Sequence, residues 1–310
     1  MIVVKDNNKT YTFKELNKKS DTNMSIKQSF QIATSEYVKW IKNPKITLIF
    51  MMLIFIYDMF VSKMISASSE LNTNICFFEP FIAVCNSIIL ILVIPAMYLG
   101  IMGDFPRVDG NSMFYLLRTG KINWIAGQII FSIMTAITYM FFVFIGITAP
   151  AVFKCEYKNS WSDVTTKYIK YFPEKSENIV AKLIDGRLYN NILPLKAVIM
   201  TFTLMVLYMV LINMILMVGF TIGKHSVGIV VSAALICISC ASVEFNTGLK
   251  WFLPTANVLP WQHYDEIYKK QIFNISYSYT YFIILIIVLS ILSSILIDNY
   301  DFSKISDMED

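Results

Sequence analysis

The sequence is poor in charged residues. Only 15% of its 310 residues are Asp, Glu, Lys or Arg, whereas 56% are hydrophobic, and the mean hydropathy is +0.57. Soluble domains seldom have this composition, because about a quarter of their residues are charged. The low charge therefore excludes an ordinary soluble domain and favours a membrane protein.

Side chains for metal binding and acid-base catalysis are also scarce. The two histidines, His225 and His263, form no HExxH motif and no pair with metal-ligand spacing, so we expect no metal site. An aspartyl mechanism would need a second acidic residue in the middle of a span besides Asp58, and the apolar runs contain none. An intramembrane enzyme would have to use His263, and the alternative is that this histidine lies in the membrane interface beside Trp261 and Tyr264.

A phosphate-binding loop is missing. The nearest match, GFTIGK at residues 219–224, has three residues between its glycines where the motif needs four, and His225 follows where a hydroxyl should bind magnesium. We therefore expect no nucleotide site, no cofactor and no ATPase activity in this chain. Close helix packing explains Gly219 and Gly223 better.

Long apolar runs dominate what is present. A bilayer core takes about 20 helical residues, and six runs approach or exceed this length: 46–66, 77–103, 122–149, 195–218, 227–241 and 277–297. The fifth is the shortest and spans only if its flanks dip into the interface, the alternative being a re-entrant segment. The sequence predicts an all-α membrane protein with six transmembrane helices, and Pro95 predicts a kink in the second.

The positive charges predict the orientation. Lysines outnumber acidic residues in segment 1–44, and the loop after the second run carries Arg107, Arg118 and Lys121. The region before the first run does not resemble a signal peptide. We expect both termini in the cytoplasm, including a polar segment 1–23 and an acidic tail 298–310, with the loop 150–194 outside. The abundance of Ile, Lys and Asn suggests a bacterial cell membrane.

Residues 24–43, ahead of the first span, have helical periodicity. We expect an amphipathic helix in the cytoplasmic interface, anchored by Tyr37 and Trp40. The alternative is a cytoplasmic helix packed against the protein itself. Its predicted apolar face consists of Ile26, Phe30, Ala33, Tyr37, Trp40 and Ile41. Residues 2–13 give a weak hairpin signal.

A polar island, DFPRVDGNSMFYLLRTGK at residues 104–121, separates the second and third runs. Turn and helix-start residues open it, and a short apolar patch comes after them. The sequence predicts a short helix on the membrane surface, facing the cytoplasm.

This layout resembles the permease subunits of the ABC type 2 exporter family, in particular those of bacterial peptide and lantibiotic transport. The resemblance implies an elbow helix before the first span, a coupling helix after the second, and a broken, partly re-entrant outer segment before the last. In this sequence they would be residues 24–43, residues 107–121 with the motif YLLRTGK, and residues 248–272.

The resemblance also implies partners. The chain would form half of a translocation path together with a second permease copy or a paralogue, and it would dock two copies of a separate ABC ATPase that binds ATP and magnesium. The cargo would be a peptide or another amphipathic compound, and no nucleic acid partner is expected. Apolar side chains would fill a groove of the ATPase and basic ones would pair with its carboxylates. The alternative is binding of anionic headgroups. The candidate docking residues are Arg107, Tyr115, Leu116, Leu117, Arg118 and Lys121.

Three polar side chains are candidates to line a cavity between the two halves: Tyr57, Asp58 and Glu79. Asp58 lies near the middle of the first run, where an Asp costs roughly 3 kcal/mol on insertion. It should therefore face protein or water rather than lipid.

Two cysteines, Cys76 and Cys155, fall at predicted outer ends of spans, where we consider a disulfide. The outer segment 154–187 mixes aromatic residues with lysines. This surface would suit an amphipathic ligand, so a sensor or immunity protein that binds an extracellular peptide without transport is the competing interpretation.

Overall fold

A computed structural model describes residues 4–6, 9–11, 25–107, 119–175, 183–265 and 270–297 of the chain. The described part is mainly helical. Its helices are α2 (Ile26–Ile41), α3 (Thr47–Ile56), α4 (Ser62–Leu71), α5 (Glu79–Asn86), α6 (Ile88–Met102), α8 (Lys121–Thr148), α9 (Asp163–Tyr171), α10 (Gly186–Tyr189), α11 (Pro194–Thr221), α12 (His225–Glu244), α13 (Pro254–Val258) and α14 (Ile275–Leu296).

Five helical stretches in the described residues are long and apolar enough to cross a membrane, and the bent pair α5 and α6 is a sixth if it counts as one span. These stretches match the six apolar runs of the sequence. The fifth, α12, reaches 20 residues because polar residues at both ends, from His225 to Glu244, continue the helix. The single stretches are Pro44–Leu71, Lys121–Lys154, Pro194–Thr221, His225–Glu244 and Ile275–Leu296.

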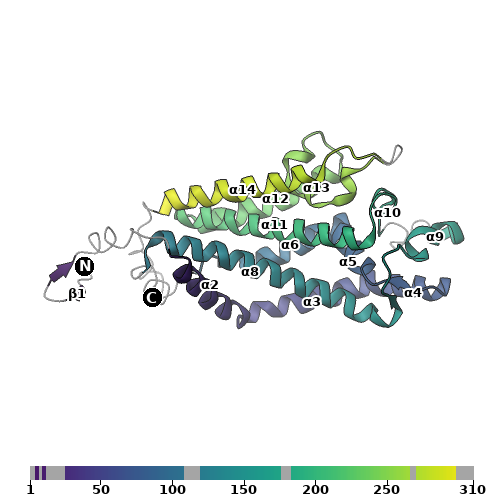
Figure 1. The fold of residues 1–310 in the computed structure, drawn as a ribbon, viewed down its shortest axis with the longest axis horizontal. Helices are drawn as coiled ribbons and strands as arrows, with labels where there is room; N and C mark the ends of the chain where they lie inside the picture. Colours follow the sequence, from purple (N-terminus) through teal and green to yellow (C-terminus); the bar gives the residue numbers. More distant parts are fainter. Residues whose placement is uncertain are drawn as a thin grey trace.

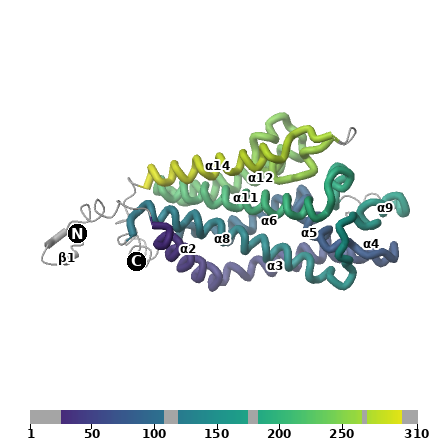
Figure 2. The backbone as a smooth tube through the Cα atoms, in the orientation of Figure 1, coloured from purple at the N-terminus to yellow at the C-terminus, as the bar shows by residue number. Residues whose placement is uncertain are grey.

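The bundle is organised around α8 and α11, which lie side by side in its middle (Figure 1). Helices α12 and α14 pack on α11, and α2 and α3 pack on α8. The tube in Figure 2 follows α2, α3 and α4 along the length of the molecule to the end where α9 lies. The start of α2 and the end of α14 lie at the opposite end, since Ser25 N donates to Asn123 Oδ1 and Lys121 Nζ donates to Ile297 O. A chain that passes along the bundle six times returns to the end from which it started, which agrees with six spans.

The second span is broken at Ser87. Helices α5 and α6 meet there at 85°, and Ser87 has an extended backbone with ψ 131°. Pro95 lies inside α6, which continues through it, so the sharp bend is at Ser87 and not at the proline. At the end of α5, Asn86 Nδ2 donates to Ile82 O and to Thr201 Oγ1 of α11, so a contact distant in sequence holds the break.

Helix α2 lies along α8 in the same direction. Its start bonds Asn123, and the hydroxyls of Tyr37 and Thr138 are 2.7 Å apart near its end. Trp40 is 6% exposed, so it is buried in the protein rather than anchored in an interface. The side of α2 that carries Trp40 therefore packs against the protein, as the alternative interpretation held. Its buried residues are Ser29, Ile32, Ala33, Glu36 and Trp40.

The other side of α2 is mixed, because Lys27, Gln31 and Lys42 are exposed there beside apolar residues. Ile26, Phe30 and Ile41, from the predicted apolar face, are exposed together with Val38. The interfacial location of the helix therefore stays a prediction that rests on this exposed side.

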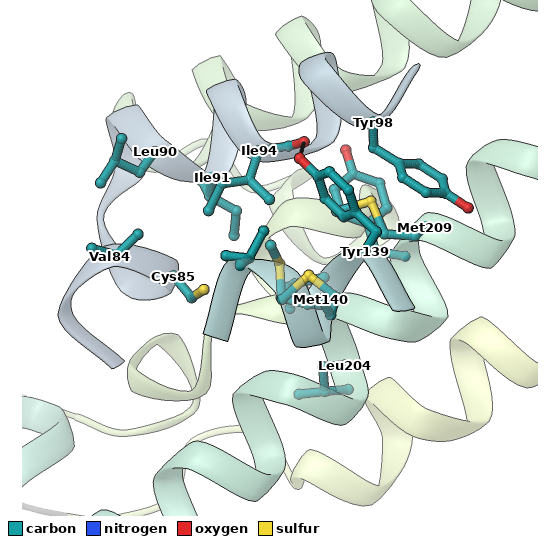
Figure 3. Packing of buried hydrophobic residues seen from close by; sticks show 14 of the residues in the cluster. Val84, Cys85, Leu90, Ile91, Ile94, Tyr98, Tyr139, Met140, Leu204 and Met209 are labelled. Atoms are coloured by element: carbon teal, nitrogen blue, oxygen red, sulfur yellow. Dashed lines mark hydrogen bonds between the residues drawn. The ribbon is translucent and has the colours of Figure 1, made fainter. Parts of the chain in front are cut away.

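The core carries a small polar network between spans. Asn213 Nδ2 of α11 donates to Tyr98 OH at 2.7 Å and to Ser132 Oγ at 2.8 Å, and the hydroxyls of Tyr98 and Thr135 are 3.1 Å apart. Tyr139 donates to the carbonyl of Ile94 on α6 (Figure 3). Because these groups are buried, the bonds fix the rotation of α6, α8 and α11 relative to one another.

Outside the bundle, two short strands join distant segments. Strand β3 (Ile75–Cys76) pairs in parallel with β4 (Cys155–Glu156), and Tyr168 of α9 donates to Glu70 of α4 at 3.0 Å. The outer loop is therefore folded onto the end of the first span. Near the amino terminus, β1 (Val4–Asp6) and β2 (Lys9–Tyr11) form the antiparallel pair that the hairpin signal predicts.

Helices α11 and α12 touch through glycine. A Cβ on Gly219 would lie 2.7 Å from Cα and 2.8 Å from N of Gly228, which leaves no room for a side chain. The close contact expected for Gly219 is therefore present, with Gly228 as the partner, whereas Gly223 has a positive φ of 78° in the connecting turn.

We expect Gly219→Ala to lower the thermal stability of the purified protein, by about 1–3 kcal/mol, because the added methyl group pushes two backbones apart. Thermal unfolding in detergent, followed by tryptophan fluorescence, measures the effect. Gly100→Ala is the matched control, since none of the described residues lies within 4 Å of its Cβ position in α6. Equal stability of the two variants would contradict the backbone contact.

Candidate functional site

The first span carries an exposed acidic residue. Between α3 and α4, residues Tyr57–Val61 form a π-helical turn, and Asp58 lies in it with its side chain exposed. Tyr57 is 40% exposed beside it. Such turns inside α-helices occur frequently at functional sites. The structure thus brings together two of the three cavity candidates.

The surface around Asp58 is apolar. We call it the α3 face, and it consists of Phe50, Met51, Ile54, Phe55, Tyr57 and Asp58, all of them exposed. Within a bilayer the apolar members can face lipid, whereas a carboxylate there costs roughly 3 kcal/mol. Water or a protein partner must therefore reach Asp58 when the chain is in a membrane.

Glu79, the third cavity candidate, lies elsewhere. Its side chain is 0% exposed and accepts bonds from Ser162 N at 2.5 Å and Ser162 Oγ at 2.6 Å. Cys76 N also donates to it. Since Ser162 is the N-cap of α9, the carboxylate is placed at a helix N-terminus. Glu79 thus connects the outer segment to the second span.

The two outer cysteines lie on the paired strands, but both are free thiols. The register pairs Cys76 with Glu156 and Cys155 with Ile75, so the cysteines are one residue out of step. Successive side chains of a strand point to opposite faces, which turns the two thiols apart. Cys76 donates to Lys158 O, and burial raises its pKa to about 11.

The coupling region is described only at its two ends. Tyr115, Leu116, Leu117 and Arg118 lie outside the described residues. Arg107 is exposed at the end of the second span.

Lys121 is buried, at 6% exposed, and its Nζ bonds the carbonyl of Ile297 at 3.1 Å. It therefore does not belong to an exposed docking surface. Its cation stabilises the carboxyl end of α14 and joins the start of α8 to the last span.

Segment 248–272, predicted to be broken and partly re-entrant, contains the short helices η6 (Lys250–Phe252), α13 and η7 (Pro260–His263). These helices pack on α11 and α12. Trp261 Nε1 donates to Asn86 O at 3.2 Å, at the break in the second span. The sequence offered no sign of this link between two distant irregular segments. Whether the segment enters the bilayer stays a prediction.

His263 is fully buried in this segment. Its Nε2 lies 2.8 Å from Ser278 Oγ of α14, and its Nδ1 lies 3.0 Å from Leu259 O. Ser278 donates to Asn257 Oδ1 in turn. Burial lowers the pKa of His263 to about 4. The histidine thus holds α13 and η7 against α14, and it is not presented to a substrate.

Among the residues that the structure describes, no group of three or more His, Cys, Asp or Glu side chains is arranged to hold a metal ion. The exposed α3 face around Asp58 is therefore the strongest candidate for a functional site in the spans.

The chain matches no protein-family model, no curated protein and no solved structure. Its function must therefore be inferred from its layout and its own side chains.

The lowered pKa of His263 predicts a pH effect on stability. The unfolded chain binds a proton at His263 near pH 6.5, whereas the folded chain does so only near pH 4, so stability falls as the pH falls from 7.5 towards 5. The contribution lost over this range is on the order of 2 kcal/mol.

We expect His263→Gln to remove this component, which thermal unfolding of the variant at pH 7.5 and pH 5 would measure. His225→Gln, which changes the other histidine, is the control and should keep the pH dependence of the unchanged protein. An identical pH dependence in His263→Gln would show that His263 does not titrate in this way.

Proposed function

We propose that this chain is the membrane-spanning permease subunit of an ATP-driven exporter of the ABC type 2 kind. It would form half of a translocation path with a second permease copy or paralogue, and ATP would be hydrolysed by a separate subunit. The observation that carries the proposal is the exposed α3 face, which ends at Asp58 near the middle of the first span.

The argument from this face is energetic. A single copy leaves a mid-span carboxylate without cover, at a cost of roughly 3 kcal/mol against lipid. Two copies that face each other would enclose a polar path, in which Tyr57 and Asp58 meet water or cargo. The apolar neighbours of Asp58 would then form the contact between the copies and the walls of the path.

The broken second span supports the same proposal. Transporters commonly build their paths with discontinuous helices, whose irregular backbone is tolerated where protein or a cavity surrounds it. Here the break at Ser87 lies between Asn86, held by Thr201 and Trp261, and the start of helix α6. Such a joint would let α6 move relative to α5 without exposing backbone to lipid.

The proposed coupling region has a direct mechanical connection to the bundle. It comes after the end of α6 and precedes α8, which Lys121 joins to the end of α14. A displacement of residues 107–121 by an ATPase would therefore act on α6 and α8 together. Movement of these two helices would change the space beside the α3 face.

The cargo is proposed to be a peptide or another amphipathic compound. Exposed aromatic side chains on the predicted outer loop 150–194, Phe153, Tyr157 and Tyr171, suit such a ligand. The same surface favours the second candidate, a sensor or immunity protein that binds an extracellular peptide without transport. The two functions differ in their need for an ATPase.

Purification from the native membrane in mild detergent tests the coupling region. We expect a soluble ATPase to co-purify in stoichiometric amount and to be lost when Leu116, Leu117 and Arg118 are all replaced by Ala, because these residues would fill and neutralise its groove. Mass spectrometry and ATP hydrolysis in the eluate are the measurements. Replacement of Phe153 and Tyr157 by Ala, on the predicted outer loop, should leave the ATPase bound. A chain recovered without any ATPase would favour the sensor.

A second experiment tests the path. We expect Asp58→Asn to retain the ATPase but to reduce transport into inside-out vesicles at least about tenfold, since a charge that cargo or water meets is lost. Asp163→Asn is the matched control, because this carboxylate pairs with Lys167 on the outer helix α9. Full transport by Asp58→Asn would remove Asp58 from the path.

A further inference from the structure

A pocket opens where α2, the end of α6 and α8 meet. It holds about 410 Å³ of empty space, counted out to its open mouth. Met102 and Phe131 contribute apolar wall, while Trp40 and Gln128 contribute polar atoms. Neither the apolar runs nor the coupling region indicated a site here.

Two hydrogen-bond donors in this pocket have no partner among the described residues. Trp40 Nε1 and Gln128 Nε2 are both buried without a hydrogen bond there, and their residues are only 6% and 1% exposed. Buried N–H groups are rarely left unpaired, because each loses its bond to water. Gln128 also lies inside the apolar helix α8, where a buried glutamine is costly unless its amide group is hydrogen-bonded. Both residues line the pocket, and a turn of either side chain would bring its N–H group to acceptor oxygens of a molecule there.

Charges of both signs surround these donors. Lys39 and Arg107 line the pocket together with Glu36 and Asp104, and Lys39 Nζ bonds Glu36 Oε1 at 3.0 Å. Lys45 pairs with Asp104 as well, so both carboxylates have a lysine partner. A ligand with a phosphate and an amine would place its amine near these carboxylates and its phosphate near the cations, whereas a purely anionic ligand would gain only from the cations.

The pocket lies at the level where spans begin and end. Lys45, at the start of the first span, pairs with Asp104, which comes just after the second. Phe105 stacks on Phe131 of α8 at 5.6 Å, and its carbonyl lies 3.0 Å from His225 Nε2 at the start of α12. Three spans thus have an end beside the pocket. This is the depth at which headgroups of a bilayer lie.

We propose that this pocket binds the phosphodiester headgroup of a zwitterionic, amine-bearing glycerophospholipid from the leaflet at this end of the bundle. The phosphodiester oxygens accept from Trp40 Nε1 and Gln128 Nε2, and the amine lies towards Glu36 and Asp104. Met102 and Phe131 would contact the glycerol and the first methylene groups of the acyl chains. A free, hydrated phosphate has no apolar part to make this contact. The site is separate from the α3 face, and it shares Arg107 with the residues proposed to dock the ATPase.

The test compares the full-length protein with Trp40→Phe/Gln128→Leu, which removes both donors and keeps their bulk. After delipidation in detergent, each protein is titrated with phosphatidylethanolamine, phosphatidylglycerol, diacylglycerol or inorganic phosphate. The shift in thermal unfolding and the lipid retained in native mass spectrometry are measured. We expect phosphatidylethanolamine to stabilise the unchanged protein and to bind the double variant about tenfold more weakly or worse, because two bonds to a charged oxygen are lost.

Controls separate binding from folding. The double variant should be at least as stable as the unchanged protein without lipid, since it lacks two unpaired buried donors. Should it fail to fold, the single variants Trp40→Phe and Gln128→Leu serve, each expected to weaken lipid binding. Tyr208→Phe, which removes a buried hydroxyl outside the pocket that is unpaired within the described residues, should leave the lipid response unchanged.

Three results would overturn the proposal. The first is an equal phosphatidylethanolamine response in the unchanged protein and the double variant. The second is an equal response to diacylglycerol, which lacks the phosphate. The third is a variant-sensitive response to inorganic phosphate alone, which would make the source a free ion rather than a lipid.

Discussion

In this bundle, polar groups buried among apolar helices need partners within the protein, and the break in the second span makes that need acute. At Ser87 the backbone leaves the helix, and the carbonyl of Asn86 would otherwise lie unpaired in an apolar surrounding. Trp261 donates to it from the segment before the last span, and Asn86 itself donates to Thr201 of α11. The second span, helix α11 and segment 248–272 are thereby held together.

The same constraint explains other long-range contacts. Tyr98, Ser132 and Asn213 Nδ2 are hydrogen-bonded to one another between three spans, and His263 and Ser278 are hydrogen-bonded between η7 and α14. Each pair joins elements far apart in sequence. Where the constraint is not met within the described part of one copy, as at Asp58 on the α3 face or at Trp40 and Gln128 in the pocket, the structure indicates a partner, water or a lipid. The two proposals for this protein come from those unmet groups.

Helix α2 illustrates how a helical pattern can be interpreted in two ways. Of the predicted apolar face, Phe30 and Ile41 are exposed, whereas Ala33 is buried together with Ile32, which lay outside that face. The choice depends on Gly127, since a Cβ there would lie 2.9 Å from Ile32 and would prevent the approach. A glycine on one helix thus determines which face of another is buried, and a periodicity within α2 cannot reveal this.

The sequence by itself determined the helical membrane character, because run length and hydropathy depend on the thickness of a bilayer and need no knowledge of neighbours. It also located Asp58 in the middle of a span and the island between the second and third spans. The folded structure was needed to find which polar residues form hydrogen bonds with other parts of the protein. Glu79 binds Ser162, the N-cap of α9, Lys121 binds the end of α14, and the register of β3 and β4 separates Cys76 from Cys155. The physical reason is that burial and hydrogen bonding depend on residues distant along the chain, whereas hydropathy and periodicity are properties of each segment alone.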